Sequence, residues 1–418
     1  ENVAPRPRPR PEGSRLMFRH LLKLIWKRKN RNLMLSLEIL LAFVVVFAIA
    51  GFIVRSNQLY HLPIGFQIDN VWAVRISAGD VPSSGSKFSP EVFDNFKRTL
   101  EAVPGIDKVA FASTAPYLSH TMRSAFEDPA GGAKVDAEVI EADDDALPLM
   151  GVRMLQGRGF NRSDNGAAAI PVAVNRRMAA ALFGTGPVLG KVFKARGREE
   201  SKGQPMQIVG VIDDYRSRGE FSIATNVLVV RYVPAVFKDG MRSILIKMKP
   251  GITRTFEETL SRQLKQVNNE WSYEIAPLSV RRADAMKSQI TPMIVLSVIA
   301  GFLLLMVAFG LFGVLWQNTT VRIPELGLRR AIGASAGNIY RQIIAEQILL
   351  SSAAMLVGLL LLVQLPITGA LGQNMNWSVF LTAAALSMSV IYLLSLLCSV
   401  YPGWRASRLS PTEALHYE

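Results

Sequence analysis

The chain has 418 residues, half of them apolar, with 19% charged side chains and a mean hydropathy of +0.23. This composition excludes an intrinsically disordered chain and is unusual for a water-soluble domain. Lys and Arg exceed Asp and Glu by 14. This excess is compatible with a nucleic acid or a membrane surface as partner, or with neither, and the positions of the charges decide among these. A single cysteine, Cys398, excludes an internal disulfide framework and a zinc site built from several thiolates. Four scattered histidines favour no metal site.

The N-terminal residues precede any apolar segment. Residues 1–16 contain alternating Pro and Arg, and we expect a disordered linker or a remnant of cloning there. Residues 17–32 contain six basic residues and no acid, which predicts a basic amphipathic helix on the cytoplasmic side.

Four apolar segments are each long enough to span a bilayer, which needs roughly 20 helical residues. Only Glu38 in the first segment and Glu346 in the third are charged. The sequence therefore predicts an α-helical membrane protein with four transmembrane helices, at residues 33–54, 293–316, 343–365 and 379–400.

The orientation of these spans follows from the basic residues of the short connecting segments. Residues 17–32, 317–342 and 401–418 together hold twelve Lys and Arg against three acids, whereas 366–378 holds no charge. Both termini and the 317–342 loop are therefore expected in the cytoplasm, and 55–292 and 366–378 outside it. Because the basic excess is explained by topology, we discard nucleic acid as a partner. The first span has a small-residue pattern like a signal-peptide cleavage site, but its length favours an uncleaved anchor.

The external segment, 55–292, is long enough for one or two domains. Strand, helix and strand patterns occur in turn at 70–77, 90–102 and 106–113, and again at 243–249, 254–269 and 272–277. We expect two membrane-proximal β-α-β units, about 55–113 and 234–292, that pack as one α+β sheet layer. The residues between them, about 114–233, predict an inserted mixed lobe. Asp143, Asp144 and Asp145 lack the alternating ligand spacing of a calcium loop and are interpreted as a solvated turn or the start of a helix.

Catalytic motifs are sparse, and the sequence predicts neither a catalytic residue nor a metal site. The sequence contains no phosphate-binding loop of the G-x-x-x-x-G-K-[ST] type. Residues 333–337 match the G-x-S-x-G pattern, but they follow a basic run instead of a strand and are interpreted as a tight turn. Two interpretations of Glu38 and Glu346 stay open: a carboxylate that reaches the interface or a nearby Arg, and a bundle-facing contact that couples the helices.

Two cytoplasmic motifs carry a family resemblance. Residues 321–335 read VRIPELGLRRAIGAS, and residues 401–415 read YPGWRASRLSPTEAL. Both resemble signatures of the FtsX/MacB superfamily of ABC transporter permeases, and features between 139 and 214 resemble that family's periplasmic core domain. Pro324 departs from the family pattern and bears on where the local helix starts.

The resemblance implies a non-catalytic permease subunit in the bacterial inner membrane, because MacB carries a fused ATPase and this sequence has none. It further implies two copies of a separate ABC ATPase that bind ATP and Mg, so no cofactor is expected on this chain. A second permease copy or a paralogue would complete a dimer, and a periplasmic adaptor and an outer-membrane duct are expected partners in export. Two alternatives stay open: the same fold regulating a cell-wall hydrolase or lipoprotein release, and a membrane receptor that senses a ligand.

The 317–342 loop is the predicted contact with the ATPase, because it joins two spanning helices directly. Leu326, Leu328 and Ile332, with Ala331, are expected to form an apolar strip, and Arg329 and Arg330 to supply charge at its rim. The residues assigned to this coupling site are Glu325, Leu326, Gly327, Leu328, Arg329, Arg330, Ala331, Ile332 and Gly333.

Overall fold

The computed structural model describes residues 29–77, 90–118, 122–127, 134–195, 205–232 and 241–408. These residues divide into a helical unit, Glu1–Gln58 with Thr291–Glu418, and a sheet unit, Leu59–Ile290. The tail expected over 1–16 and most of the amphipathic helix expected over 17–32 lie outside the described residues. Residues 29–32 begin the first long helix.

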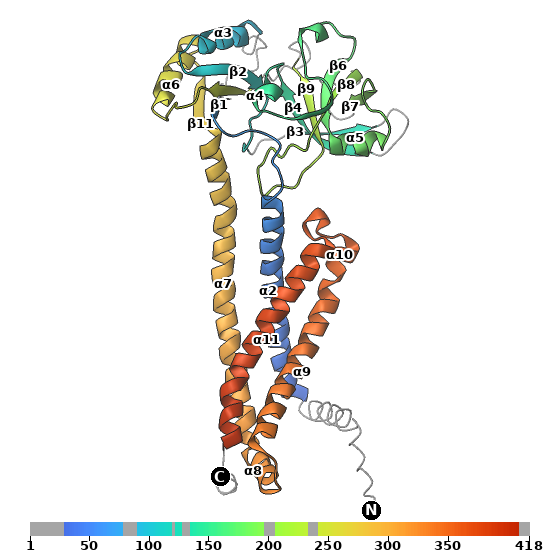
Figure 1. Cartoon of the computed structure of the whole chain (residues 1–418), viewed down its shortest axis with the longest axis vertical. Helices are drawn as coiled ribbons and strands as arrows, with labels where there is room; N and C mark the ends of the chain where they lie inside the picture. The colour runs from blue at the N-terminus through green and yellow to red at the C-terminus, as the bar shows by residue number, and fades with distance from the viewer. Residues whose placement is uncertain are drawn as a thin grey trace, which may run out of the picture. The chain divides into compact units, whose positions relative to one another are not determined.

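Four long helices are apolar enough to cross a membrane (Figure 1). They are α2 (Lys29–Tyr60), α7 (Leu278–Val321), α9 (Ala336–Leu362) and α11 (Trp377–Arg408). Each begins or ends outside the apolar segment predicted for it, because polar residues continue the helix. The 44 residues of α7 correspond to roughly 66 Å at 1.5 Å per residue, about twice the hydrocarbon thickness of a bilayer. The predicted fold class, with four membrane helices, is confirmed.

One apolar core joins the four helices within the helical unit. Its members include Ile39 and Phe43 of α2, Leu311 of α7, Met355 of α9 and Ile391 of α11. A β-carbon added at Gly358 would meet the Phe43 ring at 2.6 Å, so the glycine is needed for the close approach of α2 and α9. Between α9 and α11, the hydroxyl oxygens of Ser351 and Ser395 lie 2.9 Å apart, a polar contact typical of membrane helix pairs.

The sheet unit contains the two predicted β-α-β units. The first consists of β1 (Val71–Ser77), α3 (Pro90–Glu101) and β2 (Ile106–Ala112). The second consists of β10 (Ser243–Met248), α6 (Phe256–Val267) and β11 (Ser272–Pro277). Their strands interleave in the antiparallel order β11-β1-β10-β2, which is a split β-α-β arrangement. Both helices bury apolar residues against these strands, with Phe96 stacked on Trp271 at 5.6 Å. The expected single sheet layer is confirmed.

The inserted lobe is a closed ring of strands. Its pairing order β4-β3-β7-β8-β6-β9 is completed by a parallel pairing of β9 with β4, and closure of this kind removes exposed sheet edges. The strands of the ring are β3 (Met122–Glu127), β4 (Lys134–Ala142), β6 (Ile170–Asn175), β7 (Val192–Ala195), β8 (Pro205–Ile212) and β9 (Val227–Arg231). A further strand, β5 (Met154–Gly157), pairs with β8 outside the ring. Helices α4 (Ala146–Leu149), η1 (Arg162–Asp164) and α5 (Arg176–Phe183) complete the lobe.

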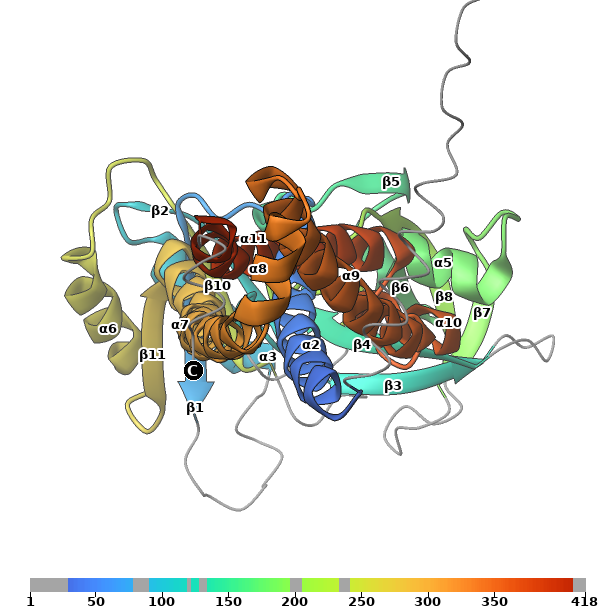
Figure 2. The same cartoon turned by 90° about the horizontal axis from the view of Figure 1, so that it is seen from below.

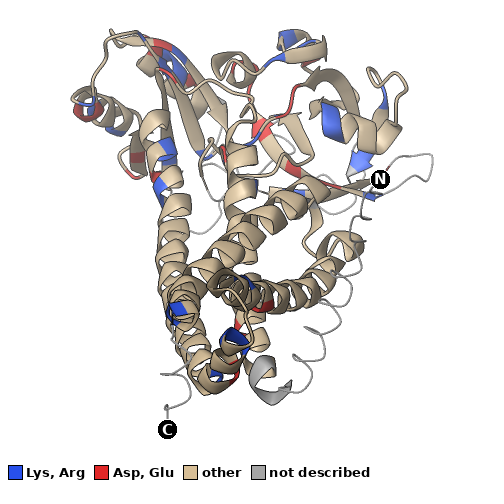
Figure 3. Ribbon diagram, turned by 60° about the horizontal axis from the view of Figure 1, so that its bottom comes forward, with Lys and Arg blue, Asp and Glu red and all other residues tan. Residues whose placement is uncertain are grey.

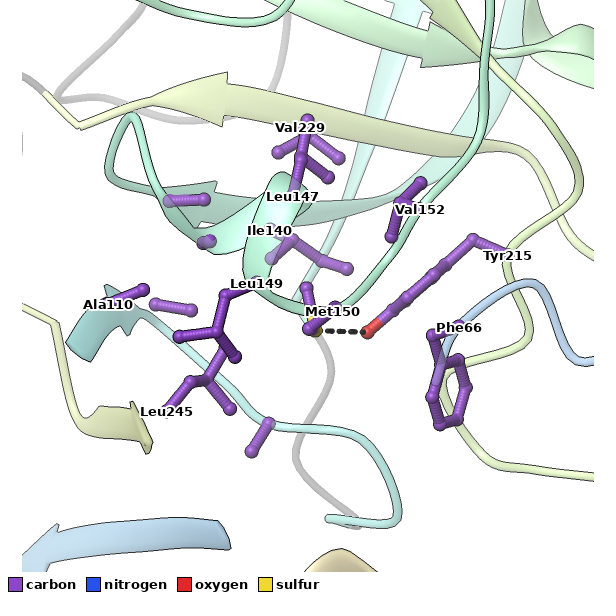
Figure 4. Packing of buried hydrophobic residues seen from close by; sticks show 14 of the residues in the cluster. Phe66, Ala110, Ile140, Leu147, Leu149, Met150, Val152, Tyr215, Val229 and Leu245 are labelled. Carbon is purple, nitrogen blue, oxygen red and sulfur yellow. Dashed lines mark hydrogen bonds between the residues drawn. The ribbon is translucent and has the colours of Figure 1, made fainter. Parts of the chain in front are cut away.

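A shared core joins the β-α-β layer to the inserted lobe. Leu147 and Leu149 of α4 pack with Ala110 and Leu245 from the layer and with Val229 from the lobe (Figure 4). At one side of this core the Tyr215 hydroxyl donates to the Met150 sulfur at 3.8 Å. The Tyr215 ring also lies 5.3 Å from Phe66, which follows α2. The loop that begins after β8 is therefore fixed to the segment that leaves α2.

Candidate functional site

A short helix, α8 (Ile323–Ala331), joins the ends of α7 and α9 within the loop predicted to contact an ATPase (Figure 2). Pro324 lies in its first turn, where a missing N–H costs no intrahelical hydrogen bond. Gly333 has φ +104°, a left-handed conformation that favours glycine and ends the helix. The Ser335 hydroxyl then accepts a hydrogen bond from the Asn338 N–H at 3.3 Å and caps α9. The G-x-S-x-G residues are thus a turn between two helices.

A closed ring of five polar side chains fixes this turn. Arg322 donates to both carboxylate oxygens of Glu346, at 2.6 and 3.2 Å. Gln342 donates to Glu346 at 2.9 Å and accepts from Arg329 at 2.9 Å. Arg329 also donates to Glu325 at 2.8 Å, and Glu325 lies 3.5 Å from the Arg322 Nε. The ring therefore joins residues from α8, from α9 and from the junction with α7.

The exposed face of α8 is narrower than the sequence predicted. Leu326 is only 3% exposed and packs with Ile339, Ile343 and Ala406, and Gly327 is also buried. Leu326 is therefore not part of an exposed apolar strip. Leu328 and Ile332 are 56% and 78% exposed, and Ala331 beside them is exposed as well. The apolar side chains of the predicted contact that remain exposed are therefore those of Leu328, Ala331 and Ile332.

The two arginines expected at the rim make contacts within the helical unit. Arg329 belongs to the polar ring, and Arg330 donates to the carbonyl of Ser407 at 3.1 Å. Arg330 thereby connects α8 to the end of α11.

Charged residues are scarce along the middle of the long helices and reappear near the C-terminal end of the chain (Figure 3).

The two acids within the spans lie in different settings. Glu346 pairs with Arg322, which is the nearby-arginine interpretation. Glu38 instead faces α7, because a β-carbon at Gly310 would lie 2.2 Å from its carboxylate oxygen. The Glu38 contact corresponds to the bundle-facing interpretation.

The loop between β8 and β9, residues 213–226, holds the end of α2. Arg216 is 2% exposed, and its guanidinium donates to the carbonyls of Leu59 at 3.0 Å and Leu62 at 2.8 Å. It also donates to the carbonyls of Glu220 and Ser222 in its own loop. A cation at a helix C-terminus satisfies unpaired carbonyls and interacts favourably with the helix dipole. Gly65 makes this approach possible, because its β-carbon would lie 2.0 Å from the Asp214 carbonyl oxygen.

The same loop also holds the beginning of α7. The Glu220 carboxylate is buried and accepts from the Arg282 Nε at 2.5 Å and from the Tyr117 hydroxyl at 3.2 Å. The hydrogen bond to Glu220 raises the pKa of Arg282. One loop of the inserted lobe therefore contacts the ends of both helices that enter the sheet unit.

Two known sequence families match successive parts of the chain. The family described as MacB-like periplasmic core domain matches residues 34–264, more than half of the chain, and the FtsX-like permease C-terminal family matches residues 297–411. The chain belongs to the MacB-like, FtsX-type ABC transporter permeases. It is a membrane protein with a large external domain, and the permease family implies an ABC ATPase as partner.

Curated relatives of the permease are distant. It is 24% identical over 332 residues to the macrolide export ATP-binding/permease protein MacB 1/2 of Paracoccus denitrificans, covering 73% of this chain and 45% of that protein. It is 23% identical over 332 residues to the uncharacterized ABC transporter permease YknZ of Bacillus subtilis, covering 78% and 79%. The crystal structure of the periplasmic region of MacB from Actinobacillus actinomycetemcomitans is 18% identical, covers 56% of this chain and 98% of that structure, and has a TM-score of 0.37.

Sequence reasoning did not find the contacts of Arg216, Glu220 and Arg282. These residues are separated along the chain from the segments that they join, and no motif marks them. A charged run directly after the buried strand β8 is the one local signal. It indicates a loop but does not say which helix the loop contacts.

The three consecutive aspartates of the permease serve structural pairs in the sheet unit. Asp144 accepts from Arg231 at 2.6 and 2.9 Å, and Asp145 pairs with Lys97. Asp143 lies between these pairs, and its carboxylate accepts from the Asp145 N–H at 3.2 Å. Burial raises the pKa of Asp143 to about 7, although Lys97 opposes the shift.

Replacing Asp143 with Asn should reduce the pH dependence of external-domain stability. A carboxyl whose pKa is higher in the folded state stabilises that state below its unfolded pKa of about 4, and this stabilisation is lost as the pH rises through about 7. The wild type should therefore unfold at a lower temperature at pH 8 than at pH 5.5, and Asp143→Asn should narrow the difference. Thermal unfolding followed by circular dichroism measures both. An Asp136→Asn control should keep the wild-type dependence, and equal pH profiles for wild type and Asp143→Asn would contradict the assignment.

Proposed function

We propose that this permease is a mechanotransmitter, which passes movement from a cytoplasmic ATPase to its external domain. One observation carries the proposal. Helices α2 and α7 each run without interruption from the helical unit into the sheet unit, where the 213–226 loop holds both through Arg216 and Glu220. A force applied at the cytoplasmic ends of these helices then reaches the external domain through buried, charge-assisted hydrogen bonds.

The ATPase is proposed to bind the exposed face of α8 as a separate subunit present in two copies. ATP and Mg would be bound by that subunit, so the permease itself would hold no cofactor and catalyse no reaction. The name of the Bacillus relative YknZ, an ABC transporter permease, is consistent with an ATPase on a separate chain. A dimer, with a second copy or a paralogue, follows from the pairing of two ATPase subunits around the nucleotides in ABC transporters.

The output is proposed to be export of a substrate that is already outside the inner membrane. Both termini would then be cytoplasmic and the sheet unit periplasmic, with an adaptor and an outer-membrane duct as further partners. The apolar character of the four spans supports this route, since a conduction path between helices requires a polar lining. The name of the Paracoccus relative, a macrolide export protein, is consistent with export.

The test is to reconstitute the permease with its ATPase in nanodiscs and to measure movement of the external domain. A cysteine introduced at Leu189 in a Cys398→Ser background provides one exposed attachment point for a spin label per chain. We expect the distance between the two labels of a dimer to change between the nucleotide-free and the vanadate-trapped state. An unchanged distance during active ATP hydrolysis would contradict mechanotransmission. A co-purified cell-wall hydrolase or lipoprotein in place of an adaptor would contradict the export output alone.

A further inference from the structure

At the end of the helical unit that carries α8, four aromatic rings from two helices stack into one plate. Phe312 and Trp316 belong to α7, and Tyr401 and Trp404 belong to α11. The Trp316 and Tyr401 rings are nearly parallel, at 8° with centroids 5.8 Å apart. Phe312 lies 6.2 Å from Trp316, and Trp404 lies 6.3 Å from Tyr401, both stacked. Tyr401 and Trp404 are nevertheless 48% and 46% exposed, so the plate faces outward from the helices.

Two arginines lie on this plate. The Arg405 guanidinium is 4.5 Å from the centre of the Trp316 ring, and that of Arg408 is 4.5 Å from the Trp404 ring. Stacking uses the face of a guanidinium and leaves the N–H groups at its edge free to donate. The ion pairs of the described residues include Arg322 and Arg329 at the same end but neither Arg405 nor Arg408. The plate therefore carries two positive charges that no described carboxylate neutralises.

A small pocket of about 50 Å³ opens beside Arg405. Its walls include Trp316, Thr319 and Thr320 of α7, Ile323 of α8, and Pro402 and Arg405 of α11. The two threonine hydroxyls already donate to the carbonyls of Leu315 and Trp316. Arg405 supplies the positive charge of the pocket wall. Since a buried water needs roughly 10–15 Å³ of such space, the pocket accommodates a group of a few heavy atoms and not an acyl chain.

We infer that this plate and pocket bind the phosphate of an anionic phospholipid headgroup. The plate continues directly from the apolar spans of α7 and α11, where tryptophan and tyrosine rings lie at the level of lipid headgroups. A guanidinium matches a phosphate with two parallel hydrogen bonds, and basic pockets between membrane helices at this level bind anionic headgroups. The lipid bound there would rest against the junction of α7, α8 and α11.

An anionic lipid at this place would stabilise the arrangement of the helices that carry α8. Arg330 already connects α8 to Ser407, and Arg405 and Arg408 flank that residue. The exposed apolar residues Leu328 of α8 and Ile332, which follows that helix, form a separate surface that the proposed ATPase contact uses. The lipid site is therefore distinct from the ATPase surface and does not depend on that assignment.

The test uses the full chain purified in detergent and titrated with phosphatidylglycerol, with bound lipid counted by native mass spectrometry. We expect Arg405→Gln to weaken the first phosphatidylglycerol site by about tenfold, a change of the size expected for losing one charged contact. Arg405→Lys should give an intermediate loss, because an ammonium keeps the charge without the planar pair of donors. The matched control is Arg341→Gln, an exposed arginine of α9, which should bind like the wild type. Phosphatidylcholine should show no difference among the variants.

Equal phosphatidylglycerol affinity in Arg405→Gln and Arg341→Gln would overturn the proposal, as would tight binding of phosphatidylcholine at the same site. A third result would assign the plate to a protein: unchanged lipid binding in Arg405→Gln together with weakened recruitment of the ATPase. Circular dichroism melting of each variant shows whether the helices remain folded. If Arg405→Gln fails to fold, Arg405→Lys alone decides between wild-type and weakened lipid binding.

Discussion

Replacing Leu328 with Asp should abolish recruitment of the ABC ATPase while the permease stays folded and inserted. Leu328 is 56% exposed on α8, so water solvates the new carboxylate in the free permease. In the complex the same carboxylate would be buried without a partner, which costs about 3–5 kcal/mol when the contact is fully desolvated. That cost corresponds to a loss of affinity of roughly 100-fold to 4,000-fold. Surface plasmon resonance with the permease in nanodiscs measures it.

Two matched substitutions separate a lost contact from a lost fold. Leu189→Asp places the same change on an exposed leucine of the external domain and should leave ATPase affinity unchanged. Leu326→Asp places it in the buried cluster with Ile339, Ile343 and Ala406, and should lower the unfolding temperature of the permease. If Leu328→Asp recruits the ATPase at wild-type affinity, α8 is not the coupling surface.

Replacing Arg216 with Ala should strongly destabilise the external domain and disconnect it from α2. The guanidinium is buried and donates to carbonyls at the end of α2 and in its own loop, all of which would lose their donor. Leaving several buried carbonyls unpaired should cost about 3–5 kcal/mol. For a domain of this size the apparent unfolding temperature should fall by about 6–20 °C. Differential scanning fluorimetry of the full permease measures the fall.

The same loop offers a matched control, Arg218, which is exposed two residues away. Arg218→Ala should unfold at the wild-type temperature, and Arg216→Lys should lie between the two, because one ammonium cannot reach all the carbonyls. Below its unfolding temperature, Arg216→Ala should still support ATP hydrolysis but should show a smaller movement of the external domain. If Arg216→Ala keeps the wild-type stability and the wild-type movement of the external domain, this loop does not transmit force.

Much of the architecture could be predicted from the sequence because it depends on local patterns. The four spans follow from apolar runs that are long enough to cross a bilayer as helices. The β-α-β units follow from strand and helix periodicities that are repeated at both ends of the external segment. The motif around Glu325 and Arg329 likewise indicates the family without reference to any tertiary contact. These features depend on composition and spacing, which a chain carries irrespective of how it folds.

Other features were decided by tertiary structure alone. Whether Leu326 or Leu328 is exposed on α8 depends on where α9 and α11 pack, and spacing within the loop cannot distinguish them. The interleaving of β1 with β10, and the closure of β9 onto β4, join strands far apart in the chain. The contacts of Arg216 with Leu59 and of Glu220 with Arg282 likewise join residues that are far apart in the chain. Such contacts become favourable only when burial removes water from both partners at once, and burial is a property of the folded chain and not of any segment.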